Sequence, residues 1–152
     1  MKKLCFVPVL VALLAPGCRG GATLVIENPH TEGKVTVQVV DSSLGKDSVF
    51  AKVVITNNTD KVVVADCRLL VLSDGLREWS PRASSRHRVQ IDPKKTSSAV
   101  KLDYRESDST QASYDLIFKP GAFRSESDTG EELEVPSLRL SVKKVEVKKV
   151  EK

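Results

Sequence analysis

The chain has 152 residues, enough for one domain with a sizeable core and too few for several such domains. Its 24 lysines and arginines nearly balance 20 aspartates and glutamates, for a net charge of +4. So small an excess does not indicate a nucleic-acid-binding protein, and we predict no nucleic-acid partner.

The first 17 residues have the pattern of an export signal. Lys2 and Lys3 make a positive start, and residues 4–14 follow with eleven residues and no charge. That is the length of a signal-peptide core, whereas a membrane-spanning helix needs roughly 20 apolar residues. We therefore predict that residues 1–17 are a signal peptide that is removed. The alternative is a buried strand or helix at the start of the fold.

The apolar core is followed by Ala15-Pro16-Gly17-Cys18, which resembles the lipobox of bacterial lipoproteins. In that family a peptidase cuts immediately before a cysteine whose sulfur carries a diacylglycerol. The resemblance implies cleavage between Gly17 and Cys18 and lipidation of Cys18, which would hold a domain on a membrane without a spanning segment. Arg19 follows the cysteine instead of aspartate, and resemblance to enterobacterial sorting then implies the outer membrane. A plain exported periplasmic protein, cleaved nearby, is the alternative.

The chain after the signal peptide is expected to consist of a spacer, one domain and a short tail. Residues 18–22 are expected to be the lipidated cysteine and a glycine-rich spacer, residues 23–147 one domain, and residues 148–152 a basic tail. Removal of residues 1–17 takes away two lysines and no acid, so 22 basic residues face 20 acidic ones and the net charge falls to +2. We expect the segment 145–152 to be peripheral to the fold.

Strand-like alternation of apolar and polar residues begins at residues 34–39 and returns at 51–56. Residues 57–60, Asn-Asn-Thr-Asp, predict a turn, because these side chains bond to their own main chain. The longest apolar run, residues 62–72, predicts one central strand or two with a bend at Asp66. Asp74-Gly75 then predicts a hairpin.

Three later segments alternate in the same way: residues 99–104, 114–118 and 138–143. Turn signals separate them, and no stretch has a helical period. The pattern predicts an all-β fold, a single antiparallel β-sandwich of about seven strands. The residues expected in its core are Val37, Val53, Ile55, Leu69, Val71, Leu102, Leu116 and Phe118.

Two segments, VFAKVVITNNTDKVVVADCRLLVLSDGLREW and KKTSSAVKLDYRESDSTQASYDLIFKPG, resemble the immunoglobulin-like domain of small bacterial lipoproteins of unknown function. The resemblance covers roughly residues 49–121. It consists of a strand ending in Asn-Asn-Thr-Asp-Lys, a strand ending in Ser-Asp-Gly and a later Tyr-x-Leu-x-Phe strand. It implies an immunoglobulin-like sandwich and implies nothing about a ligand.

The three cysteines leave one thiol in the domain. Cys5 departs with the signal and Cys18 takes the lipid, so Cys67 has no partner for a disulfide within the domain. Cys67 stands in phase with Leu69 and Val71, which predicts a small buried apolar side chain. A reactive or dimer-forming thiol is the alternative.

Residues that could carry chemistry are few, and we predict no catalytic, cofactor-binding or metal site. His30 and His87 each stand alone, so no zinc spacing is present. No Gly-x-Ser-x-Gly turn surrounds any serine. The acidic residues of two loops (Asp103, Glu106 and Asp108; Glu126, Asp128, Glu131, Glu132 and Glu134) lack the calcium-loop spacing and predict solvated loops. Asn57-Asn58-Thr59 matches a glycosylation acceptor, but a polar turn explains it equally well.

The sequence therefore predicts no enzyme but a membrane-anchored envelope module that binds or supports a partner, either an envelope protein or a glycan. Binding would use loops or an open sheet edge. The basic residues Arg82, Arg86, His87 and Arg88, and the lysines after residue 142, are expected to be solvated. The alternatives are an exported protein that binds a small ligand or metal, and a hydrolase whose site is not recognised.

Overall fold

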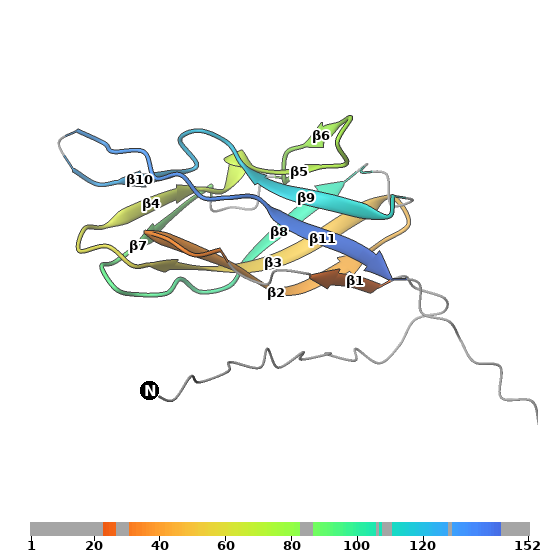
Figure 1. The fold of residues 1–152 in the computed structure, drawn as a ribbon, viewed down its shortest axis with the longest axis horizontal. Coiled ribbons are helices and arrows are strands. Elements are labelled where there is room, and N and C mark those ends of the chain that lie inside the picture. Colours follow the sequence, from red (N-terminus) through yellow and green to blue (C-terminus); the bar gives the residue numbers. More distant parts are fainter. Residues whose placement is uncertain are drawn as a thin grey trace, which may run out of the picture.

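The computed structural model describes residues 23–26, 31–82, 87–105, 107, 111–127 and 129–143. Within them the chain is all-β and every ladder is antiparallel (Figure 1). The elements are β1 (Thr23–Ile26), β2 (Val35–Leu44), β3 (Ser48–Asn57), β4 (Val63–Asp66), the 3₁₀ turn η1 (Cys67–Leu69), β5 (Leu70–Ser73), β6 (Glu78–Trp79), β7 (Arg88–Ile91), β8 (Val100–Arg105), β9 (Ser113–Phe118), β10 (Phe123–Ser125) and β11 (Leu138–Lys143).

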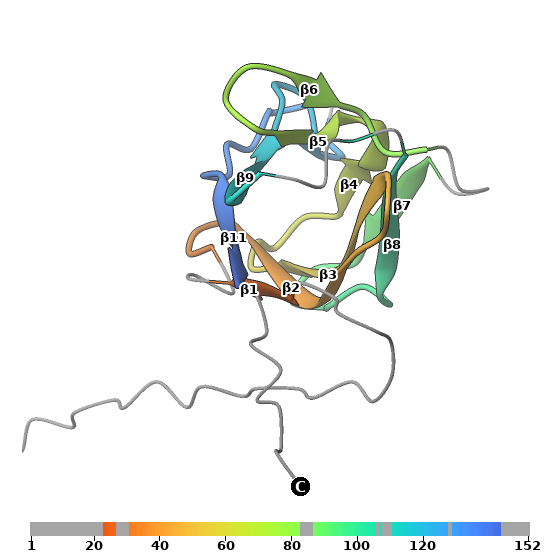
Figure 2. The same cartoon turned by 90° about the vertical axis from the view of Figure 1, so that its right-hand side faces the viewer.

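The strands form three sheets. One has five strands in the order β1-β11-β9-β5-β6, and the others have the orders β10-β4-β7 and β2-β3-β8. The two smaller sheets are joined, because the segment after β7 runs along the end of β3. Ser97 N donates to Ile55 O at 2.8 Å and Asn57 N donates to Lys95 O at 2.9 Å. Seen along its long axis, the sandwich-like domain encloses its interior on all sides (Figure 2).

One core is shared by all three sheets. Leu72, Leu116 and Leu140 come from the five-stranded sheet, Val37, Val53, Ile55 and Leu102 from the second, and Val63, Ala65 and Ile91 from the third. Each side chain is at most 2% exposed. The alternation seen in the sequence produces this arrangement, since every second residue of a strand points to the same face.

The predicted core is largely confirmed. Val37, Val53, Ile55, Leu102 and Leu116 are buried in it. For Leu69 and Phe118 the prediction of full burial is wrong. Both side chains are only partly buried and pack against the core.

Val71 is buried, at 6% exposure, but it lies between Leu70 and Leu72, whose side chains are the ones in the core. The expected phase from Cys67 through Val71 fails because η1 interrupts the strand and shifts the alternation by one residue.

The predicted bend at Asp66 is confirmed, and it moves the chain from one sheet to another. β4 pairs with β7 and β10, whereas β5, which follows the three residues of η1, pairs with β9 and β6. Asp66 caps η1: its side chain accepts from Arg68 N at 3.1 Å and from Arg68 Nε at 2.9 Å. The hydroxyl of the buried Tyr104 donates to Leu70 O at 2.8 Å and so fixes the start of β5.

The strand count exceeds the expected seven, since eleven strands occur within the described residues. The additional ones, β1, β6, β7 and β10, have only two to four residues. An alternating pattern needs about four to eight residues to be recognised, so such short strands carry too weak a signal. The predicted hairpin at Asp74-Gly75 is confirmed: Gly75 has φ 92°, and Asp74 Oδ1 accepts from Arg77 N at 2.7 Å.

The two ends of the described fold are neighbours. β1 pairs with β11 so that Thr23 stands opposite Lys143 and Ile26 opposite Leu140. The signal peptide, Gly17, Cys18 and the basic tail at 148–152 lie outside the described residues, as does the segment 144–147.

Replacement of Leu116 tests the shared core. Leu116 is fully buried and stands opposite Leu72 on β5 and Leu138 on β11. Leu116→Ala should lower the free energy of unfolding by about 2–5 kcal/mol in urea denaturation, as emptied core sites do. Leu76→Ala, at a side chain that is 95% exposed, should change it by less than about 0.5 kcal/mol. Equal effects of the two substitutions would contradict this core.

Candidate binding groove

A groove of about 300 Å³ lies on the outer face of the β2-β3-β8 sheet. This volume is at the lower end of the range for ligand sites. The residues that line it are Asp41, Ser42, Ser43, Phe50, Ala51, Lys52 and Lys101. They come from three adjacent strands, so the groove is a surface of the sheet and not a gap between loops.

A β-bulge shapes this groove. The register of β2 against β3 shifts between Val39 and Asp41, so Asp41 stands opposite Lys52 and Ser43 opposite Phe50. A bulge bends its strand and redirects the side chains that follow it. Here the side chains that share the outer face are the carboxylate of Asp41 and the hydroxyl of Ser43, since Ser42 stands opposite the buried Ala51.

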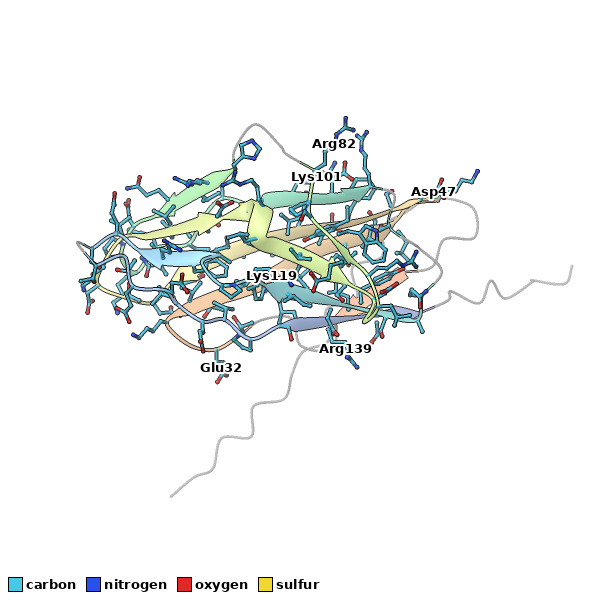
Figure 3. All side chains as sticks on the ribbon, turned by 90° about the horizontal axis from the view of Figure 1, so that it is seen from above. Glu32, Asp47, Arg82, Lys101, Lys119 and Arg139 are labelled. Carbon is cyan, nitrogen blue, oxygen red and sulfur yellow. The ribbon has the colours of Figure 1, made fainter. Side chains whose placement is uncertain are left out.

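Two lysines face each other across the floor of the groove. Lys52 on β3 stands directly opposite Lys101 on β8. Like charges in directly opposed positions destabilise a sheet by a few tenths of a kcal/mol to about 1 kcal/mol. The Lys101 ammonium lies 5.2 Å from the centroid of the Phe50 ring. Figure 3 shows Lys101 on the side of the molecule opposite Arg139.

Nine lysines and arginines in the described part of the chain have carboxylate partners. The pairs are Lys34–Glu131, Arg68–Asp66, Arg77–Asp74, Arg88–Asp66, Lys94–Asp60, Arg105–Asp103, Lys119–Glu78, Arg124–Glu132 and Arg139–Asp115. Lys52 and Lys101, like Lys61 and Lys95, are in no ion pair with another described residue, although the Asp41 carboxylate stands opposite Lys52 in the same groove. The two ammonium groups of the groove, the Phe50 ring and the hydroxyl of Ser43 could together hold an anionic group against an apolar face.

The groove is not predicted by any pattern in the sequence. Lys52 and Lys101 are visible in the sequence only as the polar members of two alternating strands. Their juxtaposition depends on the register of β3 against β8, which no motif records. The one available signal was Phe50, an aromatic residue at the start of an alternating strand.

Asp103, predicted to belong to a solvated loop, instead lies on β8 beside the groove. Its Oδ2 accepts from Arg105 Nε at 3.0 Å, and its Oδ1 is buried and has no hydrogen-bond partner among the described residues. Its backbone oxygen accepts from Arg82 N at 2.7 Å. Glu106 and Asp108 lie outside the described residues, so the structure does not bring this acidic group together.

In the second acidic loop, carboxylates pair with cations. Lys34 Nζ lies 2.9 Å from Glu131 Oε1, and a hydrogen bond from this ammonium lowers the pKa of Glu131. Glu132 pairs with Arg124 at 3.0 Å. Asp128 lies outside the described residues. Among the residues that are described, no group of three or more histidines, cysteines, aspartates or glutamates could hold a metal ion.

Asn57, the acceptor residue of the glycosylation pattern, is a structural residue. It is fully buried, and its Nδ2 donates to Lys61 O at 2.7 Å and to Ile91 O at 3.0 Å. Its Oδ1 accepts from Thr59 N at 2.9 Å. A glycan on this amide would remove these bonds, so the pattern reflects the predicted polar turn.

The basic residues around position 87 do not converge on a site within the described residues. His87 and Arg88 are exposed, and Arg88 Nε lies 3.9 Å from Asp66 Oδ2. The Arg68 side chain donates to Asp66 and lowers the pKa of this carboxyl group. Arg82 lies near β8, and Arg86 and His30 lie outside the described residues.

Sheet edges that could receive an extended partner are occupied at several points. The free side of β10 is bonded by Ser125 N to Glu131 O and by Leu133 N to Phe123 O, both at 2.9 Å. On β2, Thr31 bonds to Val37 through both its backbone N and its hydroxyl. These contacts favour the groove over edge pairing as a binding surface.

Comparison of the chain with family models, with curated proteins and with solved structures gives no match. The immunoglobulin-like assignment therefore stays a prediction, while the all-β antiparallel fold rests on the structure alone. In the part of the chain that the structure describes, no helical segment has the length and apolar character needed to cross a membrane.

Cys67 is buried, and its burial raises the pKa of the thiol. A protonated thiol is a poor nucleophile. In the chain from residue 18 carrying Cys18→Ser, native Cys67 should react with a maleimide roughly 100-fold or more slowly than in urea, because reaction requires opening of the fold. The matched control is the same chain with Cys67→Ser and Leu76→Cys, in which the exposed cysteine should react equally fast in both conditions. Fast native labelling of Cys67 would identify it as a reactive thiol.

Proposed function

We propose that this protein is a non-catalytic envelope module that a lipid on Cys18 anchors to a membrane, most simply the outer membrane, and that binds an anionic partner in the β2-β3-β8 groove. The observation that supports binding is the Lys52–Lys101 pair, two cations held directly opposite each other and in no ion pair, with one carboxylate, that of Asp41, beside them in the groove. An arrangement that costs stability is explained if an anion fills it.

The anchor follows from the sequence and fits the fold. Cys18 precedes Thr23, the first residue of β1, by five residues. Five extended residues span at most about 17 Å, so a lipid on Cys18 would keep the domain close to the bilayer surface. Two acyl chains or more are needed for stable attachment, and a diacylglycerol supplies them.

The partner is expected to be an acidic envelope protein or a glycan with acidic groups. Phe50 offers an apolar face, Ser43 offers a hydroxyl, and the two ammonium groups favour carboxylates. Hydrolysis is a poorer proposal, because no described serine or cysteine is paired with a histidine. The Cys67 thiol, the one cysteine described, is buried.

Lipidation is tested in the full chain, expressed in a bacterium that processes lipoproteins. Wild type should incorporate a palmitate analogue and partition into detergent. Cys18→Ser should lose the label because it lacks the acylated sulfur, and Cys67→Ser is the matched control that should keep it. Continued labelling of the Cys18→Ser protein would disprove the anchor.

Groove binding is tested with two polyanions, a polyglutamate peptide and an oligogalacturonate, on the chain from residue 18. Lys52→Gln with Lys101→Gln should weaken binding of the preferred polyanion by about 10-fold or more, because two charge-assisted hydrogen bonds are lost. The free energy of unfolding should change by less than about 1 kcal/mol, since the substitutions also remove a repulsion.

The matched control removes two other exposed lysines, Lys61→Gln with Lys95→Gln. It should leave binding within about 2-fold, because these lysines lie outside the groove. Preference for the peptide or for the saccharide identifies the class of partner. Equal losses in both double variants, or no binding of either polyanion by wild type, would refute the groove as the binding surface.

A further inference from the structure

The groove holds one carboxylate beside its two ammonium groups. Asp41 on β2 stands directly opposite Lys52 on β3, which stands opposite Lys101 on β8, so the three charged side chains form one row across the sheet. Directly opposed residues on neighbouring strands lie about 5 Å apart. The exposed Asp41 carboxylate nevertheless makes no ion pair or hydrogen bond with another described residue. The groove therefore offers an unused hydrogen-bond acceptor next to two cationic donors.

The backbone of the central strand in the groove is not available to a partner. β3 pairs with β2 on one side and with β8 on the other, and Phe50 and Lys52 stand in both ladders. An extended peptide that adds to a sheet gains its affinity from main-chain hydrogen bonds to an open edge. A partner that lies across this face of the sheet is therefore recognised by side chains.

The side chains of the groove match a ligand that carries hydroxyl groups close to a carboxylate. The two ammonium groups only donate and suit a carboxylate, the Asp41 carboxylate only accepts and suits a hydroxyl, and the Ser43 hydroxyl does either. Charge-assisted hydrogen bonds of both kinds are stronger than neutral ones. A partner with carboxylates alone satisfies the ammonium groups but is repelled by Asp41. A sugar acid satisfies both, because one rigid ring carries its carboxylate and its hydroxyls.

We propose that the ligand of the groove is an acidic saccharide, with its carboxylate between Lys52 and Lys101 and a hydroxyl group that donates to Asp41. This inference rests on the proposed function, since it names the partner of the same groove. The row from Asp41 to Lys101 crosses two strand spacings, roughly 10 Å, which is comparable with the length of a disaccharide. In the next row Ser43 stands opposite the half-buried Phe50, so a hydroxyl and an apolar face border the same site.

The test compares an oligogalacturonate with a polyglutamate peptide on the chain from residue 18 with Cys18→Ser. This chain retains the complete core found among the described residues, which lies between Val35 and Leu140. Wild type should bind the oligogalacturonate more tightly. Asp41→Ala should weaken that binding by about 5-fold or more, because a charge-assisted hydrogen bond is lost. The same substitution should leave polyglutamate binding unchanged or strengthen it, because a repulsion is removed. Asp41→Asn keeps a neutral acceptor and should weaken oligogalacturonate binding less than Asp41→Ala does.

Glu32→Gln is the matched control, because it also removes one exposed carboxylate, and Figure 3 shows Glu32 and Lys101 on opposite sides of the molecule. It should leave the binding of both polyanions within about 2-fold. Tighter binding of polyglutamate by wild type, or an equal effect of Asp41→Ala on both polyanions, would overturn the saccharide as the ligand. The groove would still be the binding surface in that case if Lys52→Gln with Lys101→Gln weakened polyglutamate binding. Binding of neither polyanion by wild type would refute the groove and the saccharide together.

Discussion

The passage of the chain from one sheet to another at Asp66–Leu70 is the constraint on which the rest of the fold depends. Before it, Asp66 N and Cys67 N donate to Ala122 O and His87 O; after it, Lys119 N donates to Leu69 O. The Asp66 side chain closes the turn, and Tyr104 reaches across the core to Leu70 O. Burial raises the pKa of the Tyr104 hydroxyl, which stays protonated and available as a donor. These hydrogen bonds connect the β10-β4-β7 sheet to the five-stranded sheet at the point where the chain passes between them. The sheets therefore pack on one core, and their outer faces have fixed positions.

The packing of the sheets keeps the groove and the start of β1 at different places on the domain surface. The outer face of the β2-β3-β8 sheet carries the groove with its opposed lysines, and Thr23, at the start of β1, is the point from which the proposed tether at Cys18 would extend. A protein held by its first strand would present one end to the bilayer and its long sides to the space beyond. In that orientation the groove lies on a side of the sandwich, where a partner in the envelope could reach it. Rigid sheets, rather than loops, hold Phe50, Lys52 and Lys101 in place, so the groove needs no ordering of the chain on binding.

The sequence predicted those features of the fold, the longer strands and the hairpin, that depend on residues close together in the chain. Alternation identified β2, β3, β8, β9 and β11, and Asp74-Gly75 identified the hairpin, because each signal is contained in a few consecutive residues. The alternation also predicted the burial of Cys67. It did not predict that Leu70 and Leu72, instead of Val71, point into the core, because this shift depends on the turn η1 and its cap at Asp66. The candidate site was not predictable for the same reason. Lys52 and Lys101 are 49 positions apart, and only the register between β3 and β8 makes them neighbours.

Orientation of the domain on the membrane is the claim that connects the fold with the proposed anchor. It can be measured by attaching a fluorophore to a single cysteine of the lipidated full chain in vesicles that contain a headgroup-bound quencher, with Cys67→Ser in every case and Cys18 consumed by its lipid. Leu76→Cys places the label at the end of the sandwich where β1 begins and β11 ends. Lys61→Cys places it at the opposite end, in the turn between β3 and β4. Stronger quenching at position 76 than at position 61 is the predicted result. Equal quenching, or stronger quenching at position 61, would contradict this orientation.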